Sequence, residues 1–287
     1  MKPQKNFRAS RFLVLFVVFS LACASNPSRS TDQYIQKYKK EFENDRQYFH
    51  SLSSQPVMGP YARRVEGSID DYIRLIAETF PKVQSLHIHF IMMTHYNSGL
   101  NDEVLKKVQE SQPQVKALLE ELHPDVVGYE GQYASDVTID GLAEKFREMD
   151  KEYSAFLRQE TEEEIQRLVA ENLKIDGVLQ YRRDHPEARI MGIEDKNLYY
   201  FHNLCSIYIR GAKDPETVKA VYEIFMRTQR TRDKIVIAKV VQELRRLNKK
   251  DGAIVMGAGH EQDLREISSD IGLDSIFHET FIKDPKK

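Results

Sequence analysis

Five short runs of apolar residues recur along the chain, and each is largely bounded by polar or turn-forming residues. They cover residues 86–93, 125–129, 189–193, 253–256 and 275–281. Continuous apolar runs of this length are typical of strands that are buried on both faces of a sheet. The pattern therefore predicts five buried strands.

Longer segments with helical spacing of their apolar residues lie between these runs. Segment 101–122 predicts one helix, segment 139–183 two or three, and segment 198–248 a pair that is divided at Pro215. Asp214 followed by Pro215 has the pattern of an N-cap and a proline at the first helical position. A further helical segment, 31–81, precedes the first strand.

Strands that alternate with helices predict an α/β fold with a mainly parallel sheet flanked by helices. The two long helical insertions, 139–183 and 198–248, are expected to form a cap on this sheet. No linker divides residues 31–287. We therefore expect these residues to form a single domain, which is within the usual size range.

The first 24 residues have the three parts of an export signal. Basic side chains come first, an apolar run at 12–22 follows, and small residues end the segment. The run is too short to span a bilayer comfortably. Cleavage before Cys23 would leave a lipid on its sulfur, whereas an ordinary signal peptide would be cut after Ala24. We favour the lipid-anchored form, tethered to a bacterial membrane in the cell envelope through residues 25–30.

The charged side chains nearly cancel, with 42 basic and 44 acidic residues and a formal net charge of −2. No field of one sign is implied, which argues against a nucleic-acid partner. Cys205 is the only cysteine besides Cys23. Once Cys23 is lipidated or removed, no disulfide can form within the chain, and we interpret Cys205 as a buried apolar residue.

Polar residues follow the predicted strands at the points where the strands end. His95, Glu130, Glu194 and His260 come just after four different strands, and Asp195 follows Glu194. Ligands of open parallel sheets bind beyond the carboxyl ends of the strands. Imidazole and carboxylate groups there suit either a transition metal such as Zn or Mn, or metal-free acid–base catalysis. The alternative is that each is an ordinary loop or capping residue.

Two further patterns involve glycines and histidines. Gly257 and Gly259 are predicted to let the chain turn sharply off a strand and to bring backbone amides close to a ligand. His87 and His89 alternate along the first strand and so share one face. They would either bind a metal or be satisfied by hydrogen bonds.

The order of these motifs resembles the TraB/Tiki superfamily. The segments that carry the resemblance are MMTHYNSG, VVGYEG, RIMGIED, QRTRDKIV and MGAGHEQDL, and it covers roughly residues 86–281. The wider group includes ChaN-like haem-binding lipoproteins and erythromycin-esterase-like enzymes. The resemblance implies an α/β fold and a hydrolase, either a metal-dependent protease or a metal-free enzyme.

Carried over residue by residue, the resemblance gives catalytic roles to His95, Glu130, Arg232 and His260. Met92 stands where the family has a glycine, three residues before the first histidine. The second glycine–histidine motif is intact at Gly257 and His260. Arg230 is the alternative to Arg232 for the helical arginine.

The resemblance implies a site that activates water through His95, Glu130 and His260 to cleave a peptide, an ester or another acyl compound. These three residues would also hold a divalent metal (Zn, Mn or Co), with Gly257, Gly259 and Glu194 as cofactor contacts. Arg232 would neutralise the developing oxyanion. The alternative is a non-catalytic ChaN-like lipoprotein that binds haem or another metal ligand. A structural envelope protein is the third interpretation.

Overall fold

The computed structural model describes residues 31–94 and 102–280. Five strands form one sheet in the order β3-β2-β4-β1-β5, and every neighbouring pair is parallel. The strands are β1 (His87–Met93), β2 (Val126–Tyr129), β3 (Ile190–Gly192), β4 (Asp251–Gly257) and β5 (Asp274–Glu279). The predicted α/β fold with a parallel sheet is therefore confirmed. The predicted export signal, Cys23 and His95 lie outside the described residues.

Helices fill the segments between the strands as predicted. They are α2 (Thr31–Leu52), α3 (Gly59–Thr79), α4 (Asp102–Leu122), α5 (Ile139–Glu152), α6 (Glu162–Ile175), α7 (Gly177–Asp184), α8 (Lys196–Gly211), α9 (Pro215–Arg246) and α10 (Glu261–Ile271), with short 3-10 turns η1 (Phe80–Lys82) and η2 (Ala258–His260). The Asp214 carboxylate caps α9 by accepting a hydrogen bond from the Thr217 backbone N–H at 2.9 Å. This confirms the predicted cap before Pro215. No helix within the described ranges is long and apolar enough to cross a membrane.

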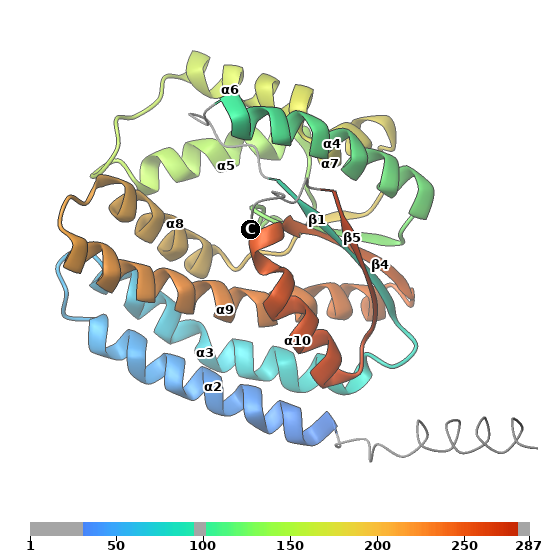
Figure 1. Cartoon of the computed structure of the whole chain (residues 1–287), viewed down its shortest axis with the longest axis horizontal. Helices are drawn as coiled ribbons and strands as arrows, with labels where there is room; N and C mark the ends of the chain where they lie inside the picture. The colour runs from blue at the N-terminus through green and yellow to red at the C-terminus, as the bar shows by residue number, and fades with distance from the viewer. Residues whose placement is uncertain (1–30, 95–101, 281–287) are drawn as a thin grey trace, which may run out of the picture.

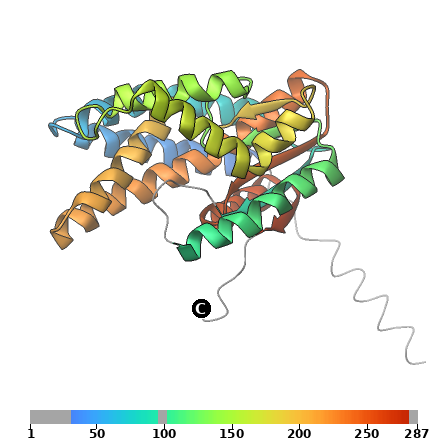
Figure 2. The ribbon, with the colours of Figure 1, turned by 90° about the horizontal axis from the view of Figure 1, so that it is seen from above.

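Helices cover both faces of the sheet (Figures 1 and 2). On one face of the sheet, α9 packs on β2 and β4. Helices α3, α8 and α10 pack against α9, and α2 lies outside these helices. On the other face, α4 packs on β1, and α7 packs on α4. Successive side chains of β1 point to opposite faces. Phe90 and Met92 therefore enter the α9 side of the core, whereas Ile91 and Met93 enter the α4 side.

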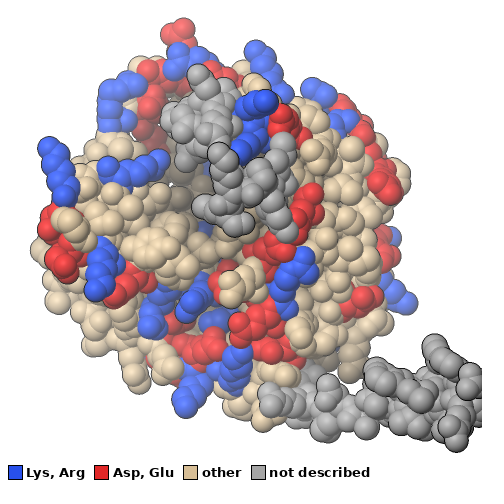
Figure 3. Space-filling model, viewed as in Figure 1, with Lys and Arg blue, Asp and Glu red and all other residues tan. Residues whose placement is uncertain are grey.

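The two insertions extend past the carboxyl edge of the sheet, where α10 begins (Figure 1). There Tyr133, on the loop after β2, connects α5 and α8. The Tyr133 and Tyr200 hydroxyls lie 3.1 Å apart, and Tyr133 donates to the Glu148 carboxylate at 2.6 Å. Charges of both signs are interspersed over the face drawn in Figure 3. The helical insertions therefore extend beyond the carboxyl edge, with tyrosines between them (Figure 1).

Replacing Gly192 by alanine tests the packing that positions two loops at this edge. A Cβ at Gly192 would lie 2.4 Å from the backbone carbonyl of Gln132, in the loop after β2. We expect Gly192→Ala to lower the free energy of unfolding by about 1–3 kcal/mol, because the backbone must move to make room. The control is Gly211→Ala in α8, where a Cβ meets nothing within 4 Å. Equal urea midpoints for both variants would contradict this packing.

Candidate functional site

Three of the predicted residues meet because the strands that precede them are neighbours. Glu194, Glu130 and His260 follow β3, β2 and β4, which lie in this order in the sheet. The loop after β2 stays close to β4, since the Glu130 backbone N–H donates to the Val255 carbonyl at 3.1 Å. The predicted convergence of these three residues is therefore present.

Helix α9 brings two more charged residues to the same edge. It ends at Arg246, just before β4 begins at Asp251 at the opposite edge of the sheet. The distance along the axis of α9 between Arg246 and Arg232 is about 21 Å. This matches the length of β4, about 20 Å. Arg232 and Asp233 therefore lie level with the carboxyl end of β4.

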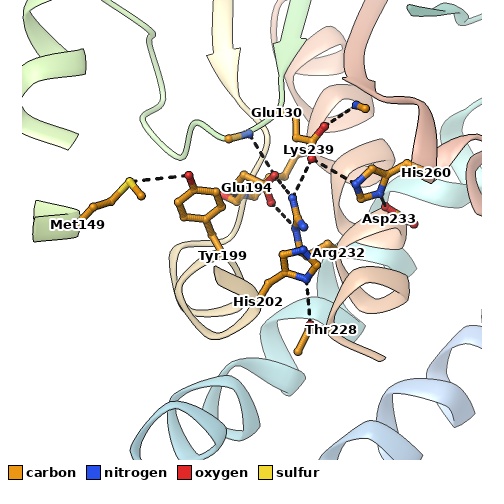
Figure 4. Close-up of polar contacts among 12 residues, drawn as sticks. Glu130, Met149, Glu194, Tyr199, His202, Thr228, Arg232, Asp233, Lys239 and His260 are labelled. Atoms are coloured by element: carbon orange, nitrogen blue, oxygen red, sulfur yellow. Dashed lines mark hydrogen bonds and ion pairs between the residues drawn. The ribbon is translucent and has the colours of Figure 1, made fainter. Parts of the chain in front are cut away.

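Arg232 joins the two glutamates (Figure 4). Its Nε donates to Glu194 Oε2 at 2.9 Å, and its Nη2 donates to Glu194 Oε1 at 2.5 Å and to Glu130 Oε1 at 3.2 Å. Only 4% of Arg232 and 1% of Glu194 are exposed. The guanidinium is thus held by both carboxylates within the protein, where charge-assisted hydrogen bonds are strong.

His260 lies between two carboxylates. Its Nδ1 contacts Asp233 Oδ1 at 2.5 Å, and its Nε2 faces Glu130 Oε1 at 3.2 Å. The second oxygen of Glu130 accepts the backbone N–H of Gly257 at 2.6 Å. The five side chains Glu130, Glu194, Arg232, Asp233 and His260, which we name the carboxyl-edge cluster, therefore form one continuous polar network.

Electrostatics fix the charge of His260. Burial alone would lower the pKa of His260, but the attraction and hydrogen bonds of Asp233 and Glu130 outweigh it and raise this pKa to about 10. Burial raises the pKa of Asp233 above its ordinary value, against the attraction of His260 and Arg232. At neutral pH His260 is therefore an imidazolium, with Nδ1 hydrogen-bonded to Asp233 and Nε2 in an ion pair with Glu130.

Lys239 is a further cation next to the carboxyl-edge cluster. Lys239 lies about two turns after Arg232 on α9, and its Nζ donates to the backbone carbonyl of Glu194. Burial lowers the pKa of Lys239, against the attraction of Asp195 and Glu194. Lys239 thus holds the loop after β3 in place.

Three residues of this region were not predicted from the sequence: Asp233, Lys239 and His202. Asp233 directly follows Arg232, so the Arg-Asp pair on one helix was an available signal. His202 of α8 hydrogen-bonds Thr228 of α9, one turn before Arg232 (Figure 4). No motif marked Lys239 or His202, because their place depends on how α8 and α9 pack.

The glycines act differently from the prediction. Gly257 has φ −63° and ψ 144°. Any residue adopts this extended conformation, so the special turn expected there is not required. Its contribution is the backbone N–H that Glu130 accepts. A Cβ on Gly259 would meet nothing within 4 Å. Its carbonyl accepts a hydrogen bond from Gln229 at 3.2 Å.

The other candidates lie away from the carboxyl-edge cluster. His89 Nδ1 contacts His278 Nε2 at 2.8 Å, and His87 Nδ1 contacts Asp274 at 2.8 Å, so the hydrogen-bonded alternative holds for both strand histidines. Arg230 is exposed and lines a separate groove between α2 and α9. Cys205 is fully buried as predicted, and burial raises the pKa of its thiol to about 12.

A metal ion would need a lone pair on His260. Both ring nitrogens of this imidazolium face carboxylates, and the Arg232 guanidinium touches the same Glu130 oxygen. Among the described residues, no group of three or more His, Cys, Asp or Glu side chains is arranged to hold a metal. These residues do not by themselves fit a metal, and we derive no step through one. His95, the third predicted ligand, lies outside the described residues, so the metal and the alternative haem stay predictions.

The chain matches no protein-family model, and neither a curated protein nor a solved structure is significantly similar to it. The resemblance to the TraB/Tiki superfamily therefore stays a prediction from the motifs.

The charge of His260 predicts a pH dependence of stability. A folded-state pKa of about 10 exceeds the ordinary 6.5. The stabilisation is therefore complete below pH 6.5 and is lost as the pH rises through 10. The pKa difference sets an upper limit of about 5 kcal/mol, which the raised pKa of Asp233 reduces. Urea unfolding at several pH values should show this loss for the native protein and not for His260→Gln. Parallel pH dependences of the two proteins would contradict the assignment.

Proposed function

We propose that this chain is an exported, lipid-anchored hydrolase of the TraB/Tiki kind that cleaves a peptide or an ester at the carboxyl edge of its sheet. The observation that carries the proposal is the carboxyl-edge cluster, a buried network of three carboxylates and two cations. Burying five ionisable groups costs free energy that apolar residues of similar volume would not cost. Such clusters in folded proteins concentrate at functional sites.

The contacts suggest a role for each member. Asp233 orients His260 and stabilises its charge, as a carboxylate does for a catalytic imidazole. The Arg232 guanidinium would stabilise negative charge that develops on a substrate carbonyl, and the positive charge of His260 nearby would add to the field. Glu130 would bind the attacking water beside His260. Because Arg232 already contacts both glutamates, its larger role is to fix Glu130 and Glu194 in position.

The proposal is tested with the purified mature protein on p-nitrophenyl acetate and on a fluorogenic casein substrate. We expect hydrolysis by the native protein and a large loss in His260→Gln. An absorption spectrum of the same sample tests the alternative, since a haem Soret band would favour a binding lipoprotein. If the native protein hydrolyses both substrates no faster than His260→Gln does, the hydrolase proposal is wrong.

The proposed export and lipid anchor predict which residue is the first of the mature protein. Because Cys23 ends the apolar run, we expect mass spectrometry of the mature protein to find a lipid-modified Cys23. A free N-terminus at Ser25 would reject the lipid anchor while keeping export. A mature pool that retains Met1 would reject both.

A further inference from the structure

The groove between α2 and α9 has no part in the proposed function. Its volume is about 530 Å³, which is within the range of small-molecule sites. Arg230 and Lys234 line the groove, whereas Arg232 belongs to the carboxyl-edge cluster. Two residues along a helix correspond to a rotation of about 200°. The groove is therefore on the opposite face of α9 from the carboxyl-edge cluster.

Four charged residues that line the groove are paired across it. Lys234 Nζ contacts Glu41 Oε2 at 2.6 Å, and Arg227 Nη1 contacts Asp45 Oδ1 at 2.9 Å. Asp45 and Lys234 are each only 6% exposed. The Arg227 guanidinium also lies over the ring of Tyr48, 4.3 Å from its centroid. These contacts join α2 to α9 and give the groove a defined floor.

Two further charges of opposite sign line the groove without such a partner. Arg230 and Glu223 are exposed, and no described residue forms an ion pair or a hydrogen bond with either side chain. They lie seven residues apart on α9, which is about two turns, so they share one face about 10 Å apart. Met226 lies between them, and the half-exposed ring of Tyr222 lies next to Glu223. The groove thus offers a cation, an anion and an apolar surface to a ligand.

A short peptide in its zwitterionic form matches this arrangement. Its terminal carboxylate would accept two parallel hydrogen bonds from the Arg230 guanidinium, the geometry that arginine favours. Its terminal ammonium would pair with Glu223. An extended chain advances about 3.3–3.6 Å per residue, so three residues span about the 10 Å between the two charges. A simple carboxylic acid would use Arg230 and leave Glu223 without a partner.

We propose that the groove between α2 and α9 binds extended peptides of about three residues by their two charged ends. The middle side chain of the peptide lies over Met226, whose thioether adapts to apolar and aromatic groups. This binding uses neither the carboxyl-edge cluster nor the lipid anchor. It is therefore independent of the proposed hydrolase function.

The test measures binding of the tripeptide Ala-Phe-Ala to the purified mature protein by isothermal titration calorimetry at pH 7 and low salt. We expect saturable binding with one peptide per chain. Acetylating the N-terminus or amidating the C-terminus of the peptide should raise Kd about tenfold, because each change removes a hydrogen-bonded contact between charged groups.

Two variants assign each end of the peptide to its partner. Arg230→Gln should raise Kd for the free peptide about tenfold and leave Kd for the amidated peptide nearly unchanged. Glu223→Gln should do the same with the acetylated peptide. The matched controls are Arg167→Gln and Glu163→Gln, two exposed positions on α6, which should bind the free peptide as the native protein does.

The same titration with His260→Gln separates the groove from the carboxyl-edge cluster. We expect its Kd to equal that of the native protein, whatever the outcome of the hydrolase test. Loss of binding in His260→Gln would place the peptide at the cluster and overturn the proposal. Absence of saturable binding, or capped peptides that bind as tightly as the free one, would also overturn it.

Discussion

Replacing Arg232 by methionine is expected to lower the free energy of unfolding by about 3–5 kcal/mol, which is typical when one partner of a buried ion pair is removed. The guanidinium is the cation that touches both Glu130 and Glu194. Methionine fills similar space but leaves these two buried carboxylates without it. The measurement is urea unfolding at pH 7.

Arg230→Met is the matched control, because Arg230 lies two residues earlier on α9 and is exposed. We expect it to change stability by no more than about 0.5 kcal/mol. Adding Glu194→Gln to Arg232→Met should recover part of the loss, since one uncompensated charge is then removed. Equal losses for the two arginine variants, or no recovery in the double variant, would show that Arg232 is not the centre of the network.

Glu130→Gln is expected to lower kcat/KM by about 10²- to 10⁴-fold while the fold is kept. Glutamine has nearly the same shape, but it removes the charge that faces both His260 and Arg232. The control is Glu261→Gln, next to His260 in the chain, whose carboxylate instead accepts from Arg265 Nε at 2.7 Å. Similar activity of Glu130→Gln and Glu261→Gln would remove Glu130 from the catalytic proposal.

Most of the fold could be predicted from local pattern. The apolar runs predicted the five strands, and Asp214 with Pro215 predicted the start of α9. Strand order could not be predicted, because β1 pairs with β4 and β5, which are far along the chain. Strand ends were also approximate. β4 begins at Asp251, two residues before the apolar run, because Asp251 pairs in register with His87.

The residues of the candidate site could likewise be predicted from the sequence only in part. Glu130, Glu194 and His260 could be predicted because each follows a strand, and topology then brings them together. Asp233 and Lys239 were missed because charged residues on a helix normally face solvent. The middle of α9 is an exception, since it is buried on all sides from Thr231 to Ala238. Only the packing of α3, α8 and α10 around α9 shows that Asp233 lies inside the protein and that Lys239 is half-buried.

In the proposed hydrolase, Glu130 and His260 act as one catalytic unit. The most direct measurement compares kcat/KM of the native protein, Glu130→Gln, His260→Gln and the double variant on one ester substrate. Residues that act as a unit show losses that are far from additive. We expect each single variant to lose most of the activity and the double variant to be little worse than either. Losses that multiply, or single variants with native activity, would contradict it.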